Sequence, residues 1–235
     1  GKGPHLFRVS GSAAPRGGLM HLNCCNFDGF GPIPPFCQEV IRECMARGFT
    51  GIVCDLEGGS LPPLEQMVRE LGTQCLRRSW TLVVPEPYGH CSPHALVSIS
   101  SALSGGTLVQ RLREAQERFG RDRIVLGLRR VAEDFFLPSP TGSGNPLTQE
   151  ELQERIAQMN PSIFFSHELC ARYFTYMSRE SGAHFVLFDD SSTLAQKLQV
   201  ARSLDIRIVL TSWSEISNAV EELGLRRMAS SRIIH

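Results

Sequence analysis

Short apolar runs alternate with segments of helical period along most of the chain. Runs of strand length cover residues 19–25, 50–56, 80–84, 95–101, 123–128 and 206–210. Between them, apolar residues recur every three or four positions, which predicts helices over residues 36–47, 61–76, 107–119, 193–204 and 214–223. Strands alternating with helices of this length are typical of βαβ units around a parallel sheet, so we expect an α/β fold.

A hairpin interrupts this alternation before the last strand. Residues 173–176 and 184–188 flank a polar turn that contains Gly182. The polar stretch at residues 137–146 predicts a loop, and Thr148 begins a T-x-x-E box that predicts the start of a helix. The length of 235 residues fits one large α/β domain, and we expect a single domain over residues 1–235.

Composition and charge exclude several classes of function. The 24 Lys and Arg residues balance 24 Asp and Glu, and the pI is near 7.2, which argues against a nucleic-acid or anionic membrane surface. No apolar run approaches the ~18 residues that a membrane span needs. The chain has 8 cysteines but no C-x-x-C, and several lie in apolar runs. We expect reduced, structural thiols, which favour a reducing compartment.

The most informative segment is G-F-T-G-I-V-C-D-L-E at residues 48–57. On a strand, Ile52, Cys54 and Leu56 point to one face, whereas Asp55 and Glu57 point to the other. The first face is wholly apolar, as expected where helices cover a sheet. The second becomes acidic toward the carboxyl end of the strand, which is where parallel α/β barrels carry their active sites.

Residues 50–57, T-G-I-V-C-D-L-E, resemble the signature D-G-x-D-x-D-x-E of glycoside hydrolase family 18. They are closer still to the G-V-N-I-D-F-E form of the spore-associated peptidoglycan glycosidases in that family. The hairpin, the helix after it and the last strand, I-R-I-V-L-T-S-W at residues 206–213, resemble the same subgroup. The resemblance implies a (β/α)8 barrel of the TIM type with a β-hairpin insertion before the last strand.

Carried over by position, the resemblance implies a role for three residues. Glu57 would be the general acid that protonates the glycosidic oxygen. Asp55 would orient the N-acetyl group of the substrate, which acts as the nucleophile in this retaining, substrate-assisted reaction. Trp213 would form the apolar floor beneath the sugar ring, and an indole buried in the core is an equal alternative for it.

Three further residues are expected to bind substrate at the same end of the barrel. Glu86 and Tyr88 follow the strand at residues 80–84, and Asn23 lies near the end of the first strand. Ordinary loop residues are the alternative interpretation for Glu86 and Tyr88. His90 and His94 are spaced as a metal-binding pair, but such a pair needs a helix, and Pro93 breaks one there. We therefore expect no metal and no cofactor.

The segment also departs from the family pattern. Thr50 and Val53 replace the first two aspartates of the signature, and residues 97–104, V-S-I-S-S-A-L-S, lack the Tyr and Asp that end the sixth strand of active members. Only residues 5–9 and 19–25 read as strands before the signature, which predicts a barrel incomplete at its N-terminal side.

Two functions follow from these observations. The first is a glycoside hydrolase acting on glycans that contain N-acetylhexosamine, either peptidoglycan or chitin-like oligomers. The alternative is a catalytically inactive carbohydrate-binding or scaffold protein on the same barrel. The expected partner is a glycan, with no nucleic acid and no membrane span. The family resemblance allows spore or cell-envelope association beside the reducing compartment that the cysteines favour.

Overall fold

The computed structural model describes residues 6, 17–24, 27, 30–103, 105–138, 142–179 and 182–225, which form two compact units. Within the described residues, the first unit holds the chain up to Ile99 together with Gln116–Val125, and the second holds Ser100–Ala115 and residues 126–225. The division into two units does not test whether residues 1–235 form a single domain, which remains a prediction. The strand predicted at residues 5–9 lies outside the described residues.

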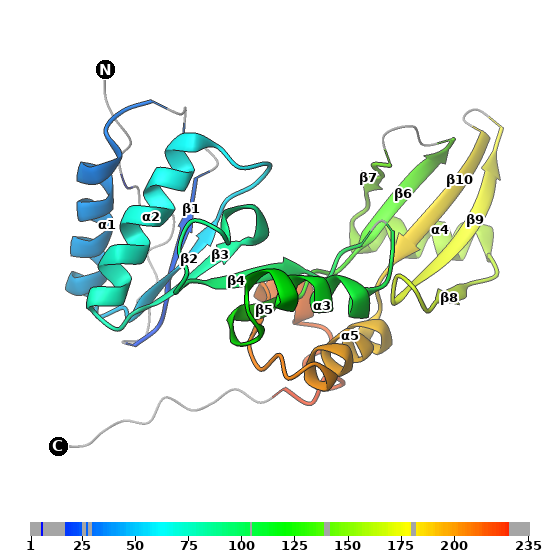
Figure 1. The fold of residues 1–235 in the computed structure, drawn as a ribbon. Helices are drawn as coiled ribbons and strands as arrows, with labels where there is room; N and C mark the ends of the chain where they lie inside the picture. Colours follow the sequence, from blue (N-terminus) through cyan, green and yellow to red (C-terminus); the bar gives the residue numbers. More distant parts are fainter. Residues whose placement is uncertain are drawn as a thin grey trace. The chain divides into compact units, whose positions relative to one another are not determined.

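Four parallel strands form the sheet of the first unit, in the order in which they follow one another in the chain (Figure 1). They are β1 (Met20–Asn23), β2 (Gly51–Asp55), β3 (Thr81–Pro85) and β4 (Leu96–Ser100). In register, Ile52 of β2 lies between Met20 of β1 and Leu82 of β3. Parallel neighbours need a crossover connection. An α-helix supplies it between β1 and β2 and between β2 and β3, whereas the short helix η1 (Glu86–Tyr88) lies between β3 and β4.

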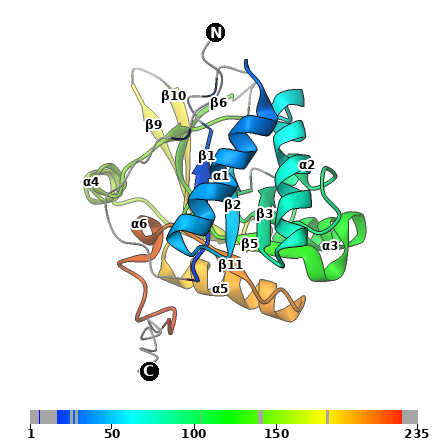
Figure 2. The same cartoon turned by 90° about the vertical axis from the view of Figure 1, so that its left-hand side faces the viewer.

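Helices α1 (Ile33–Arg47) and α2 (Pro62–Arg77) lie in front of strands β1 to β3 in the view of Figure 2. Proline occupies the first turn of both helices, where its missing N–H would have no helical partner. Gly48 caps α1 in the left-handed conformation, with φ 71°. The two predicted helices are therefore confirmed: α1 begins three residues earlier than predicted and ends where predicted, and α2 begins and ends one residue later.

Free thiols form part of the core between these helices and the sheet. All seven described cysteines are free. Burial raises the pKa of Cys44 to about 12 and that of Cys54 well above its ordinary value. Both thiols therefore stay protonated near neutral pH and pack as small apolar groups. The expectation of structural thiols is confirmed for these two residues.

The second unit is built on an antiparallel sheet of five strands in the order β7-β6-β10-β9-β8. These strands are β6 (Ala132–Leu137), β7 (Asn145–Pro146), β8 (Phe164–Ser166), β9 (Ala171–Ser178) and β10 (Gly182–Phe188). Strands β9 and β10 confirm the predicted hairpin. The loop predicted over residues 137–146 is wrong at both ends, because β6 reaches Leu137 and Asn145 pairs with Asp134.

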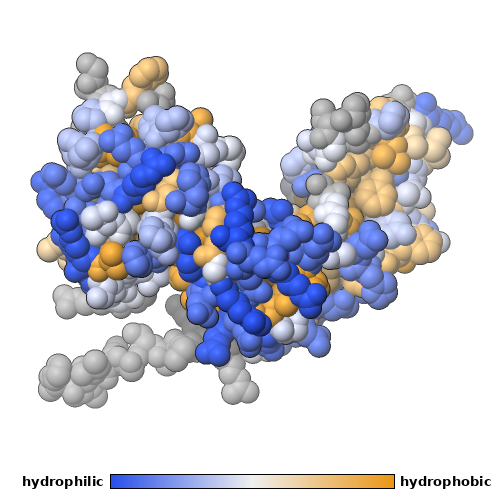
Figure 3. Space-filling model, viewed as in Figure 1, coloured by the Kyte–Doolittle hydropathy of each residue, from blue (hydrophilic) through white to orange (hydrophobic). Residues whose placement is uncertain are grey.

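Helix α4 (Gln149–Met159) packs on the face of this sheet that carries Phe174 and Val186. An aromatic row lies on the opposite face, where the ring centroid of Tyr173 is 5.6 Å from that of Phe164 and 5.2 Å from that of Phe185. Figure 3 shows apolar surface over the second unit in orange. The sheet is thus covered by a helix on one face and carries stacked rings on the other.

Three further elements of the second unit follow the hairpin. They are α5 (Ser191–Ser203), β11 (Val209–Leu210) and α6 (Trp213–Ile216). Thr148 forms the capping box that its sequence predicts at the start of α4, and Asp190 forms another at the start of α5. The helix predicted over residues 214–223 is too long, because turns follow α6 after Ile216.

Strand β11 pairs in parallel with the end of β5 (Ile124–Gly127). Counted over both units, the described residues contain six strands of the parallel type, β1 to β5 and β11. A closed barrel of this class needs eight. The barrel is therefore incomplete, as predicted. No helix within the described ranges is long and apolar enough to cross a membrane.

Candidate functional site

Strand β2 separates a buried apolar face from a polar, open one. Ile52, Cys54 and Leu56 are buried in the core that also contains α1 and α2. Asp55 is partly buried, and Glu57, two residues further, is exposed. The predicted alternation is confirmed, so the acidic residues lie on the side of the strand that the helices do not cover.

Asp55 lies against β1 at the carboxyl ends of the two strands. Its Oδ2 is 3.2 Å from Nε2 of His21, and its Cα is paired in register with that of Asn23. In β1, Met20 and Leu22 are buried whereas His21 and Asn23 are exposed. Three polar side chains thus gather at this edge. His21 was not among the residues predicted from the sequence, although its alternate position in M-H-L-N places it on the same face as Asn23.

Glu57 lies just beyond the end of β2, in a turn of two glycines. Gly58 has a φ of 80°, and a Cβ added to either Gly58 or Gly59 would meet no atom within 4 Å. Among the residues that the structure describes, none forms a hydrogen bond or ion pair with Glu57. A solvated carboxyl group on an open turn is free to meet a ligand, unlike Asp55, which is held by its neighbour.

Tyr88 is not accessible to a glycan, which corrects its predicted role in substrate binding. It ends the short helix η1 (Glu86–Tyr88) and is fully buried. Its hydroxyl donates to the carbonyl of Gly59 at 3.3 Å and accepts from the backbone N–H of Leu61 at 3.2 Å. Burial raises the pKa of Tyr88, so the hydroxyl stays neutral and keeps its proton to donate. Tyr88 therefore anchors the turn that follows Glu57.

Replacing Tyr88 with phenylalanine is expected to lower the free energy of unfolding by about 1 kcal/mol, because the partly buried hydrogen bond from the N–H of Leu61 loses its acceptor. Amide hydrogen exchange around residues 59–61 should accelerate at the same time. Urea unfolding and exchange mass spectrometry measure the two effects. The matched control is Tyr173→Phe, whose hydroxyl has no hydrogen bond to any described residue. Equal stability of the Tyr88 variant and the unchanged chain would contradict the anchoring role.

The two remaining predicted residues, Glu86 and Trp213, are both accessible to solvent, Glu86 in part. Glu86 is partly buried at the start of η1, and its Oε1 is 4.0 Å from the guanidinium of Arg118. Trp213 begins α6 in the second unit and is 69% exposed. The alternative of a core indole is therefore wrong for Trp213. An exposed indole is available for stacking on a sugar ring.

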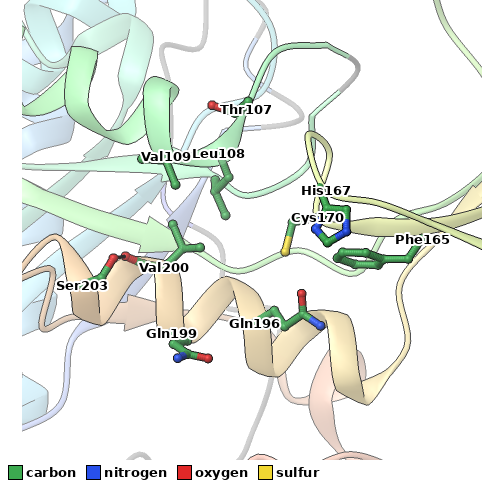
Figure 4. Close-up of a pocket in the computed structure, with 10 residues that line it drawn as sticks. All are labelled: Thr107, Leu108, Val109, Phe165, His167, Cys170, Gln196, Gln199, Val200 and Ser203. Carbon is green, nitrogen blue, oxygen red and sulfur yellow. Dashed lines mark hydrogen bonds between the residues drawn. The ribbon is translucent and has the colours of Figure 1, made fainter.

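The second unit also contains a cavity of about 550 Å³, drawn in Figure 4. His167 and Cys170 lie on one side of it, opposite Leu108 and Val109. Helix α5 contributes polar side chains, among them Gln196. None of the predicted site residues lines this cavity, and its lining contains no carboxyl group. It therefore offers no carboxylic acid to protonate a glycosidic oxygen.

Comparison with known proteins gives matches at the level of structure. No family model matches the chain, and no curated protein sequence matches it. Among solved structures, YdhD of Bacillus subtilis, assigned as a sporulation-specific glycosylase, superposes with a TM-score of 0.62 at 15% identity, over 82% of this chain and 78% of YdhD.

Two chitinases superpose equally well. The chitinase of Chromobacterium violaceum has a TM-score of 0.62 at 16% identity, over 83% of this chain and 72% of its own. The class V chitinase of Nicotiana tobaccum has a TM-score of 0.62 at 12% identity, over 88% and 81%. The fold is thus that of the TIM-barrel chitinases, in a divergent and incomplete form. This chain has a chitinase-like, glycoside hydrolase-type fold of the kind implied by residues 50–57.

Proposed function

We propose that this protein hydrolyses glycans containing N-acetylhexosamine by a retaining, substrate-assisted reaction. Glu57 donates the proton to the glycosidic oxygen. Asp55 orients the N-acetyl group of the substrate and supports the positive charge that develops on it. Asn23 and Glu86 contact the glycan, and the exposed indole of Trp213 stacks on a sugar face.

The observation that best supports this proposal is that the two carboxyl groups at the end of β2 have different surroundings. Asp55 is fixed beside His21, 3.2 Å from its Nε2, whereas Glu57 lies exposed on the glycine turn. A group that orients an acetamide must hold one position, and a neighbouring imidazole restricts the carboxylate in this way. A proton donor must reach an oxygen of the substrate, for which an open turn is suited.

The nature of the glycan is proposed from the neighbours in structure. The tobacco chitinase has been crystallised with NAG4, an oligomer of the proposed class. YdhD and the spore cortex-lytic enzyme SleL of Bacillus megaterium carry names that refer to the spore, and this chain spans 49% of SleL. These names support peptidoglycan or chitin-like oligomers as substrate, and spore or cell-envelope association.

A non-catalytic glycan-binding protein is the second candidate, favoured by the sequence of β4. Residues 97–104 carry no Tyr and no Asp, and β4 has Ser98 and Ser100 at its less buried positions. Loss of one contact to the transition state costs roughly 100-fold or more in rate. A chain lacking both side chains therefore fits a binder as well as a slow enzyme.

The test is release of reducing ends from NAG4 and from purified peptidoglycan by the full chain. We expect turnover that falls about 100- to 10,000-fold in Glu57→Gln, because the general acid is lost. The matched control is Glu117→Gln, an exposed glutamate on α3 (Leu108–Phe119). Absence of turnover together with oligosaccharide binding would establish the second candidate. Absence of both would overturn the proposal.

A further inference from the structure

Three metal-binding side chains that are not among the residues proposed to act on the glycan converge in the first unit. Glu65 lies in the first turn of α2, and His90 and Cys91 lie in the turn after η1. Their ligand atoms all lie within 4.8 Å of one another. Residues 65 and 90 are distant in sequence, so the fold, rather than a local motif, brings this set together.

The two distances from His90 fit a tetrahedral ion. Nε2 of His90 is 3.5 Å from Sγ of Cys91 and 3.5 Å from Oε1 of Glu65. An ion bonded at about 2.0–2.1 Å to nitrogen and oxygen and about 2.3 Å to sulfur separates N from S by about 3.6 Å and N from O by about 3.4 Å. The imidazole nitrogen therefore already lies at ligand spacing from both other groups.

The turn that carries His90 and Cys91 is held firmly. The guanidinium of Arg123 donates to the carbonyls of Gly89 at 2.9 Å and Ser92 at 2.7 Å. Ser92 packs so closely on α2 that a Cβ on Gly72 would come within 2.5 Å of its Oγ. The turn and the helix are thus fixed relative to each other, which reduces the cost of bringing the ligands together.

Two neighbouring side chains orient the carboxylate of Glu65. The guanidinium of Arg69 donates to Oε2 of Glu65 at 2.8 Å, and Ser60 donates to Oε1 at 2.6 Å. Each carboxylate oxygen has two lone pairs, so Oε1 retains one for a metal. Hydrogen bonds of this kind from a second layer fix the orientation of metal ligands in proteins.

We propose that Glu65, His90 and Cys91 bind one divalent ion of the zinc class. A thiolate, an imidazole and a carboxylate are the ligand types that Zn²⁺ takes, whereas Mg²⁺ and Ca²⁺ prefer oxygen alone. On binding, the thiol proton of Cys91 passes to solvent and a sulfur–metal bond forms. The thiolate and the carboxylate then balance the two charges of the ion.

The site has an open side. His90 is 48% exposed in its side chain, and Cys91 is 8% exposed. An ion can therefore enter from solvent at the imidazole, and the three protein ligands leave the fourth tetrahedral position for water. This assignment corrects the expectation of no metal, which considered only His90 with His94. The partners of His90 in space are the adjacent cysteine and a glutamate on α2.

The experiment is titration of the chelator-treated full chain with Zn²⁺ in a calorimeter, and with Co²⁺ in a spectrophotometer. We expect one ion per chain and a thiolate-to-cobalt charge-transfer band. His90→Gln should weaken zinc binding about 100-fold or more. Cys91→Ser should abolish the charge-transfer band, and Glu65→Gln should weaken binding as well. The matched control, His94→Gln, changes an exposed histidine of the same segment and should bind zinc unchanged.

Two results would overturn the site. One is a His90→Gln chain that binds zinc as tightly as the unchanged chain. The other is an equal loss in His94→Gln, which would place the ion elsewhere on the segment. Because His90 is half exposed, its variant is expected to fold even if Cys91→Ser does not. The readout is metal binding, so it is independent of any glycosidase activity.

Discussion

Replacing Lys197 with methionine is expected to lower the free energy of unfolding by about 3–5 kcal/mol, because the change leaves a buried carboxylate without its counter-ion. Nζ of Lys197 is 2.7 Å from Oδ2 of Asp189, and both side chains are almost completely buried. Urea unfolding followed by circular dichroism measures the loss. Hydrogen exchange across α5 locates it in the second unit.

The contacts of Asp189 explain the size of this effect. Its carboxylate also accepts from the backbone N–H of Val131 at 2.8 Å and from the hydroxyl of Thr193 at 2.7 Å. These neutral donors would remain in Lys197→Met, but the charge would not be balanced. The pair therefore ties α5 to the segment before β6, and removing one partner costs more than the intact pair contributes.

Two further variants make the prediction specific. Gln199→Met places methionine at an exposed position of the same helix and should change stability by about 0.5 kcal/mol at most. The double variant Asp189→Asn with Lys197→Met removes both charges and should be more stable than Lys197→Met alone. A double variant no more stable than the single one would show that packing, and not the unpaired charge, sets the cost.

The arrangement of α1, α2 and β2 could be predicted because it depends on short-range periodicity. Alternation in residues 52–57 placed Ile52 in the core and Asp55 on the open face, and a helical period located both helices. Cap residues act over three or four positions, so the helix start at Thr148 could be predicted in the same way. Each of these features follows from neighbours that are close in sequence.

Features that depend on pairing between distant segments could not be predicted from the sequence. His21 meets Asp55 only because of the register of β1 on β2. Tyr88 was expected to face the glycan because it follows a strand, but its hydroxyl instead binds the turn at residues 59–61. The same limit explains why the contact between Glu65 and His90 could not be predicted.

Replacing Gly51 with alanine is expected to lower the free energy of unfolding by about 3 kcal/mol or more, because the new methyl group has no space. A Cβ at this position would lie 2.2 Å from the carbonyl oxygen of Thr81 and 2.7 Å from Cδ2 of Leu19. The leucine side chain can rotate away. The carbonyl belongs to β3, which is paired with Gly51 in register, so relief requires the two strands to separate.

Urea unfolding of Gly51→Ala measures this cost, and Gly105→Ala is the matched control. A Cβ at Gly105 would meet no atom within 4 Å, so alanine there should leave stability unchanged or raise it slightly. Equal stability of the two variants would mean that β2 and β3 tolerate separation. The prediction gives a steric reason for the glycine of the signature, distinct from the chemical reason for Asp55 and Glu57. Gly51→Ala therefore tests the sheet that positions Asp55, whereas Glu57→Gln tests the chemistry while leaving that sheet intact.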